Sequence, residues 1–88
     1  MGYSIHYADT AIKALKKIDP HQTRLIIAWI EKNLIGCDNP RSHGKPLTDD
    51  LKGLWRYRIG AYRIIADIQD AVITIEIVDV GHRRGIYR

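Results

Sequence analysis

The chain has 88 residues, of which 45% are hydrophobic and 27% are charged, with a formal net charge of +4 and an isoelectric point near 9.4. This composition excludes a disordered or collagen-like chain and indicates one globular domain over residues 1–88. No run of 18 apolar residues is present, which excludes a transmembrane helix. The basic balance favours a polyanionic partner, and the excess charge lies in residues 52–88, which carry seven basic and four acidic side chains.

The single cysteine, Cys37, cannot form an internal disulfide and has no metal-ligating companion at a useful spacing. The first ten residues show neither a signal peptide nor a myristoylation signal. We therefore expect a cytoplasmic protein with no membrane attachment. The histidine spacing fits no zinc motif, and neither GxxxxGK[ST] nor GxGxxG is present, so no metal and no nucleotide cofactor is expected.

The first half of the chain predicts one short strand followed by two amphipathic helices. Residues 3–7 (YSIHY) alternate in polarity, and a helix begins at residue 9 or 10 and ends near residue 17. Asp19 as N-cap and Pro20 at the first helical position predict a second helix that ends near Ile35. This second helix should bury one stripe of side chains, namely Leu25, Ile26, Trp29, Ile30 and Leu34.

The second half predicts a loop over residues 37–52 and then three strands, at residues 54–59, 62–68 and 71–80. The loop is rich in proline and turn-forming residues, whereas the strands are rich in β-branched residues. The fold class is therefore α+β, with an N-terminal strand, an αα-hairpin and a three-stranded antiparallel meander whose helices pack on one sheet face.

The first hairpin places arginines together. A two-residue type II′ turn at Gly60–Ala61 sets Arg58 directly opposite Arg63, and Arg56 lies on the same face because side chains two residues apart in a strand point the same way. The same alternation places His82 beside this face, just past the third strand. Like charges that oppose each other destabilise a sheet by about 0.2–1 kcal/mol. Converging guanidiniums are suited to gripping a phosphate, so the face is predicted to bind one.

A purely structural reading of this face is the alternative. A turn at Gln69–Asp70 would place Glu76 opposite Arg63, and the face would then be a solvated charged surface with one ion pair. The segment VGHRRGIYR favours the functional reading, because it adds an imidazole that exchanges protons near neutral pH, two guanidiniums and a phenol. Its tyrosine, Tyr87, either packs as a terminal aromatic or stacks on a base.

The segments GKPLTDDLKGLWRYRIGAYRIIADI and VGHRRGIYR resemble the RelE branch of the RelE/ParE superfamily of small toxins from toxin–antitoxin pairs. The resemblance spans nearly the whole chain. It implies a metal-independent, ribosome-dependent mRNA endoribonuclease that works in the ribosomal A site. It also implies a toxin–antitoxin hetero-oligomer in which a RelB-like antitoxin wraps the toxin. In that chemistry the ribose 2′-hydroxyl attacks the adjacent phosphate and leaves a 2′,3′-cyclic phosphate and a 5′-hydroxyl.

The resemblance also assigns roles to individual residues. Arg58 and Arg63 would stabilise the pentavalent phosphorane, His82 or Arg83 would protonate the 5′-oxygen, and Tyr87 would stack on a base or orient the 2′-hydroxyl. RNA or phosphate contacts are expected from four further residues, Lys45, Lys52, Arg56 and Arg84. Arginines stand where relatives have hairpin lysines, and Lys45 stands near the place of a glutamate in other relatives. The general base is therefore left open.

Two other functions compete with the nuclease. The first is a ParE-like toxin of the same fold that inhibits DNA gyrase, or a catalytically silent toxin. The second is a nucleic-acid-binding module whose basic face contacts the backbone without chemistry. The arginine, histidine and tyrosine residues of VGHRRGIYR favour the nuclease, because neither alternative needs a phosphate clamp beside an imidazole.

Overall fold

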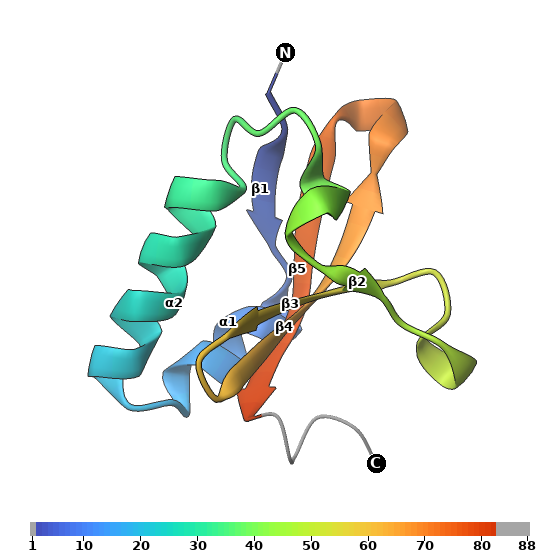
Figure 1. The fold of residues 1–88 in the computed structure, drawn as a ribbon. Coiled ribbons are helices and arrows are strands. Elements are labelled where there is room, and N and C mark those ends of the chain that lie inside the picture. The colour runs from blue at the N-terminus through green and yellow to red at the C-terminus, as the bar shows by residue number, and fades with distance from the viewer. Residues whose placement is uncertain (1, 83–88) are drawn as a thin grey trace.

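Two helices and a β-hairpin form where the sequence predicts them, and the helices cover one face of a five-stranded sheet (Figure 1). The structure, a computed structural model, describes residues 2–82. The sheet order is β1-β5-β4-β3-β2, in which β1 is parallel to β5 and the other neighbours are antiparallel. The helices and strands are α1 (Asp9–Lys16), α2 (Pro20–Asn33), β1 (Ser4–Tyr7), β2 (Lys45–Pro46), β3 (Trp55–Ile59), β4 (Tyr62–Gln69) and β5 (Thr74–His82). The predicted α+β class is confirmed.

Helix α2 begins as predicted, because the Asp19 carboxylate accepts hydrogen bonds from the backbone N–H groups of His21 (3.1 Å) and Gln22 (3.3 Å). The helix ends at Asn33, slightly earlier than expected. The prediction that Leu25 lies in the core is wrong, since its side chain is 48% exposed. The buried stripe of α2 is thus narrower than the sequence pattern indicates. No helix in residues 2–82 is long and apolar enough to cross a membrane.

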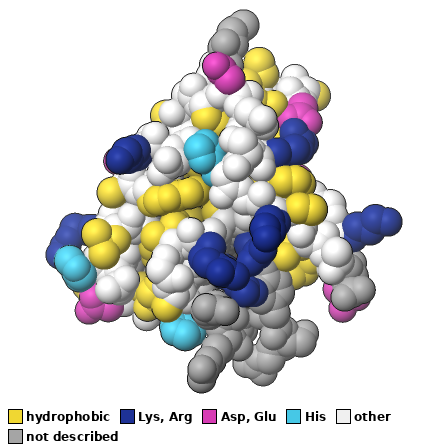
Figure 2. Space-filling view, in the orientation of Figure 1, with side chains coloured by type: hydrophobic (Ala, Val, Ile, Leu, Met, Phe, Trp, Pro, Cys, Tyr) yellow, Lys and Arg dark blue, Asp and Glu magenta, His cyan; other side chains and the backbone are white. Residues whose placement is uncertain are grey.

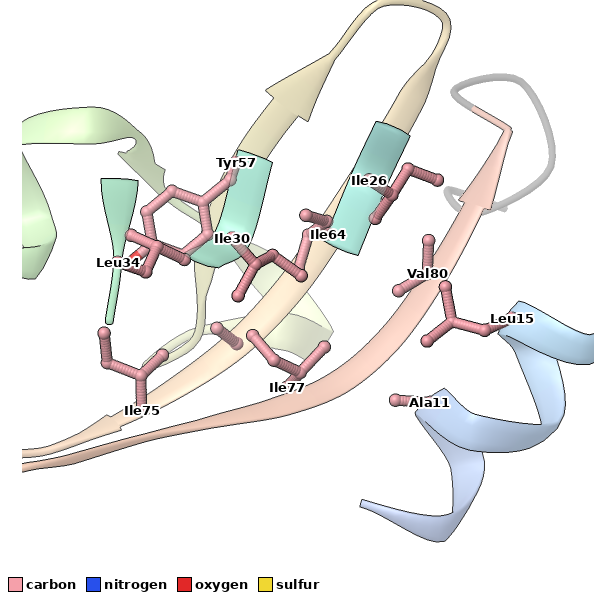
Figure 3. Packing of buried hydrophobic residues seen from close by; sticks show 11 residues of the cluster. Ala11, Leu15, Ile26, Ile30, Leu34, Tyr57, Ile64, Ile75, Ile77 and Val80 are labelled. Atoms are coloured by element: carbon pink, nitrogen blue, oxygen red, sulfur yellow. The ribbon is translucent and has the colours of Figure 1, made fainter. Parts of the chain in front are cut away.

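The core lies between the sheet and both helices (Figure 3). Tyr57 projects from the sheet toward the α2 residues Ile30 and Leu34, while Val80 lies near Leu15 of α1. The fully or almost fully buried members are Ala11, Leu15, Ile26, Ile30, Leu34, Tyr57, Ile64, Ala66, Ile75, Ile77 and Val80. This packing fixes which sheet face meets the helices, and hence which face carries the arginines.

The β3–β4 hairpin has the predicted register. Ile59 pairs with Tyr62 and Arg58 pairs with Arg63. A type II′ turn requires a positive φ at its first central residue and a negative φ at its second. Gly60 has a φ of +57°, and Ala61 is not among the described residues with positive φ, so the turn is of this type. The turn chemistry therefore sets the two arginines opposite each other.

The pairing of β4 with β5 contains a β-bulge that the sequence did not reveal. Ile65 pairs with Asp79, but its neighbour Ala66 pairs with Ile77, so Val78 is an extra residue in β5. One extra residue exchanges the two faces of a strand. Val80 consequently points into the core, and His82, paired with Tyr62, lies on the helix side of the sheet.

The connection between β4 and β5 also differs from the predicted two-residue turn. Residues 70–72 form a short 3-10 helix, η3 (Asp70–Val72), and Ile73 follows in the left-handed region with a φ of 49°. Strand β5 therefore begins at Thr74, and Glu76 pairs with Asp67. Glu76 therefore does not pair with Arg63, as the purely structural alternative required. The Glu76 carboxylate instead lies 3.1 Å from Nδ1 of His6, on the neighbouring strand β1.

Candidate functional site

Four cationic side chains share the sheet face that points away from the helices. Lys45 of β2 pairs with Arg56 of β3, and Arg58 of β3 pairs with Arg63 of β4. Lys45 and Arg58 are exposed, whereas Arg56 and Arg63 are half-buried. Figure 2 shows Lys and Arg side chains gathered in the lower centre of the molecule. We call these four residues the cationic face.

A polar cavity of about 340 Å³ adjoins the cationic face. Arg56 and Arg58 form one part of its lining, together with Lys45. The rest of the lining comes from the preceding loop, residues 42–44. A volume of this size is at the lower end of the range for small-ligand sites, about 300–1,000 Å³. The cavity offers three cations to an anionic ligand, and bidentate guanidinium contacts suit phosphate.

The loop that completes the cavity is fixed to β3 by two contacts. The buried Tyr57 hydroxyl donates a 2.7 Å hydrogen bond to the carbonyl of Pro40, which begins the 3-10 helix η1 (Pro40–His43). Gly44 packs so closely on β3 that a Cβ there would lie 2.1 Å from the carbonyl oxygen of Arg56. Burial also raises the pKa of Tyr57, so the phenol stays protonated and able to donate.

A surface ion pair holds the same loop from the other side. The Arg41 guanidinium binds the Asp70 carboxylate through both terminal nitrogens, at 3.1 and 2.8 Å, and lies 5.8 Å from the centre of the Trp55 ring. The Tyr3 hydroxyl donates to the same carboxylate at 2.6 Å. Hydrogen bonds from Arg41 and Tyr3 hold the pKa of Asp70 below its usual range, and the bond to Asp70 raises the pKa of Tyr3. Three segments distant in sequence are thereby joined beside the cavity.

The prediction that His82 lies beside the arginines is wrong. The bulge at Val78 turns its side chain to the helix side, where its ring meets the Tyr62 ring at a centroid distance of 5.7 Å and an angle of 77°. His82 therefore does not share the cationic face. A strand without the extra residue would have placed it there, which is what period-two alternation predicts.

The remaining predicted residues divide into two groups. Lys52 is exposed in the turn after the 3-10 helix η2 (Asp49–Leu51), and it is not among the described residues that line the cavity. Arg83, Arg84 and Tyr87 lie outside the described residues, and their roles stay predictions.

Sequence reasoning missed the contribution of Ser42 and His43 to the cavity. These residues reach it because Lys45 and Pro46 form a two-residue strand, β2, on the edge of the sheet. Such a strand is too short to leave a periodic signal. The sequence predicts a loop over these residues, and it contains no pattern that identifies β2.

Comparison with known proteins agrees with this architecture. Residues 5–87 match the family described as the ParE toxin of the type II toxin–antitoxin system parDE. The chain is 33% identical to the toxin RelG of Mycobacterium tuberculosis, over all of this chain and 99% of RelG. It is 30% identical to the toxin RelE of the same organism, over 98% of this chain and 87% of RelE. The chain belongs to the RelE/ParE family of type II toxin–antitoxin toxins.

Solved structures show the same fold. The toxin–antitoxin complex RelBE2 of Mycobacterium tuberculosis contains a chain with a TM-score of 0.85 and 30% identity, covering 94% of this chain and 93% of that one. A free mutant of E. coli RelE gives a TM-score of 0.75 with 16% identity, over 98% and 88% of the two chains. The RelE–RelB complex of Pyrococcus horikoshii gives 0.65 with 24% identity, over 94% and 97%.

Proposed function

We propose that this toxin is a ribosome-dependent mRNA endoribonuclease that arrests translation. The observation that supports the proposal is the convergence of Lys45, Arg56 and Arg58 on one polar cavity, with Arg63 directly opposite Arg58. A surface adapted only for stability gains nothing from opposed cations. A phosphodiester carries the negative charge that a group of cations attracts, and the named relatives RelG and RelE are toxins.

In the proposed reaction the 2′-hydroxyl oxygen of one ribose attacks its own 3′-phosphate. The new O2′–P bond forms as the P–O5′ bond breaks, the proton of the 2′-hydroxyl passes to water, and O5′ gains a proton, so the products carry a 2′,3′-cyclic phosphate and a 5′-hydroxyl. Arg58 and Arg63 bind the non-bridging oxygens and stabilise the charge that develops on the phosphorane, while Lys45 and Arg56 hold the flanking backbone. Removing one such donor costs about 100- to 1,000-fold in rate in other enzymes.

Of the two residues that the sequence suggests as donors of the proton to O5′, His82 and Arg83, only Arg83 is retained. His82 is not positioned to protonate O5′, because its ring lies on the opposite side of the sheet from the arginines. Arg83 would protonate O5′, and Tyr87 would stack on a base or orient the 2′-hydroxyl, as the family resemblance implies. Arginines are poor proton acceptors, so much of the catalysis is attributed to alignment of the mRNA within the ribosomal A site.

The partner proposed for this toxin is a RelB-like antitoxin. The RelBE2 complex of Mycobacterium tuberculosis and the RelE–RelB complex of Pyrococcus horikoshii both pair a toxin with its antitoxin. We extend that assembly to this chain, as a cytoplasmic toxin–antitoxin hetero-oligomer. An acidic antitoxin segment would complement the cationic face.

A ParE-like inhibitor of DNA gyrase is the second candidate. One observation favours it: the description of the family that matches residues 5–87 names the ParE toxin. This candidate needs no phosphate clamp on the sheet.

Induction of the protein in bacteria separates the two functions. The nuclease predicts new mRNA ends within translated codons, mapped by primer extension, that are lost in Arg58→Ala and kept in Lys13→Ala. Lys13 is an exposed lysine of α1, so the second variant removes a positive charge from a different element. Growth arrest with intact transcripts and trapped or broken DNA would establish the gyrase inhibitor instead.

A further inference from the structure

One part of the cavity lining is not used by the proposed chemistry. His43, the last residue of η1, lines the cavity together with Arg56 and Arg58, and its side chain is exposed. Three cations of the cavity account for phosphate binding. The imidazole is available to contact a different part of the ligand.

The imidazole of His43 packs edge-on against an aromatic ring of α2. Its ring meets the Trp29 ring at a centroid distance of 6.3 Å and an angle of 87°, and the Trp29 ring in turn lies 5.7 Å from that of the buried Tyr57. The backbone on either side is also fixed, by the Tyr57–Pro40 hydrogen bond and the close packing of Gly44 on β3. An aromatic ring positioned by other aromatic rings loses little freedom when a ligand stacks on it.

The neighbouring residue adds a hydrogen-bond acceptor. The Ser42 hydroxyl donates its proton to the Asn39 carbonyl at 2.9 Å, so its oxygen still has lone pairs to offer. Ser42 also lines the cavity. Such an oxygen suits the exocyclic amino group of a base.

The volume of the cavity exceeds the needs of one phosphate. Its 340 Å³ corresponds to roughly ten molecules of liquid water. Single-stranded RNA is recognised by aromatic or imidazole rings that stack on bases while cations contact the backbone. A cavity that is lined by cations and by an exposed histidine has the residue types for both contacts.

We propose that His43 forms a base-stacking subsite for single-stranded RNA, next to the backbone phosphates that Arg56 and Arg58 contact. The inference rests on the proposed function, because it takes the ligand of the cationic face to be an RNA strand. In this arrangement the backbone lies on the arginines, and one adjoining base stacks on the exposed face of the imidazole. His43 then contributes to the choice of nucleotide beside the cleaved bond.

Binding of short 2′-O-methyl tetranucleotides tests the subsite, because these probes lack the attacking hydroxyl and cannot be cleaved. One probe has a base at each of its four positions. Each of four other probes is abasic at a different one of these positions. NMR titration of the wild-type protein should show that loss of one particular base weakens binding by about 5- to 100-fold. In His43→Ala the complete probe should bind as weakly as that abasic probe, whereas His43→Phe, which keeps a stacking ring but cannot accept a proton, should retain the difference.

The outcomes separate the subsite from the function on which it rests. Equal affinity of the complete probe and all four abasic probes, with binding still lost in Arg58→Ala, would overturn the subsite and leave the phosphate site standing. Weak binding by His43→Phe as well as His43→Ala, with unchanged thermal unfolding, would overturn stacking. Failure of the wild-type protein to bind any probe would overturn both the subsite and the phosphate site.

Discussion

Arg58 and Arg63 are cross-strand partners in the β3–β4 hairpin, and each adds its positive charge to the same sheet face. Lys45 and Arg56 repeat the arrangement across the neighbouring pair β2–β3. Like charges that lie directly opposite each other generally destabilise a sheet. A ligand with regularly spaced negative charges reverses that effect, which connects the stability of the hairpin to its proposed function.

Replacing Arg58 by threonine should stabilise the free protein while impairing it as a toxin. Removal of one opposed charge and insertion of a good strand former should raise the free energy of unfolding by about 0.2–1 kcal/mol at low salt. The gain should shrink with added sodium chloride, because salt screens exposed charges. Urea unfolding at two ionic strengths measures it. If Arg58→Thr is less stable than wild type, and the difference in unfolding free energy does not change with salt, the proposed repulsion between Arg58 and Arg63 is contradicted.

The dependence of RNA affinity on salt concentration should report the number of phosphate contacts. Each backbone contact to a single strand contributes about 0.7 to the slope of log affinity against log salt concentration. Arg56→Ala and Arg58→Ala should each reduce that slope by about this amount, and Lys13→Ala should leave it unchanged. Anisotropy titrations with a labelled oligonucleotide provide the slopes. Equal slopes for all four proteins would show that the strand does not touch the cationic face.

Tyr57→Phe should loosen the loop that completes the cavity. The variant leaves the Pro40 carbonyl without its buried donor, and the expected loss in unfolding free energy is about 1–2 kcal/mol. Amide exchange should accelerate in η1 more than in α1. Uniform acceleration across the chain would show that the hydroxyl contributes only global stability and does not position the loop.

The Arg41–Asp70 pair should make stability depend on acid pH. Because the folded state lowers the pKa of Asp70 below its usual 3.8, its ionised form stabilises the fold. That contribution is complete above the usual pKa and disappears as pH falls through the lowered one. Asp70→Asn should therefore be less stable than wild type at pH 7, and the two should converge in strong acid. A difference that stays constant between pH 7 and pH 2 would contradict the linkage.

The sequence predicted the parts of the site that depend on strong local signals. Gly60 and Ala61 specify a turn with only one register, so the opposition of Arg58 and Arg63 follows from the sequence alone. Asp19 and Pro20 likewise specify the start of α2. In each case a few residues determine the backbone through sterics or hydrogen bonding.

Other parts depend on tertiary packing that leaves no such signal. The extra residue, Val78, lies between Ile77 and Asp79, and it is neither glycine nor proline. The sequence therefore did not predict that His82 lies on the helix side of the sheet. Ile73 adopts a left-handed backbone conformation that β-branched residues rarely take. The start of β5 at Thr74 could therefore not be predicted from the sequence either. The place of His43 in the cavity required the pairing of β2 with β3.

Cleavage on programmed ribosomes tests the central claim most directly. Purified toxin is mixed with ribosomes that hold a defined mRNA codon in the A site, and the 3′ ends of the products are identified under single-turnover conditions. We predict a 2′,3′-cyclic phosphate, no cleavage when the nucleotide 5′ to the cut is 2′-deoxy, and a rate about 100- to 1,000-fold lower for Arg58→Ala and for Arg63→Ala. Intact mRNA with the wild-type toxin, or wild-type rates in both arginine variants, would contradict the account.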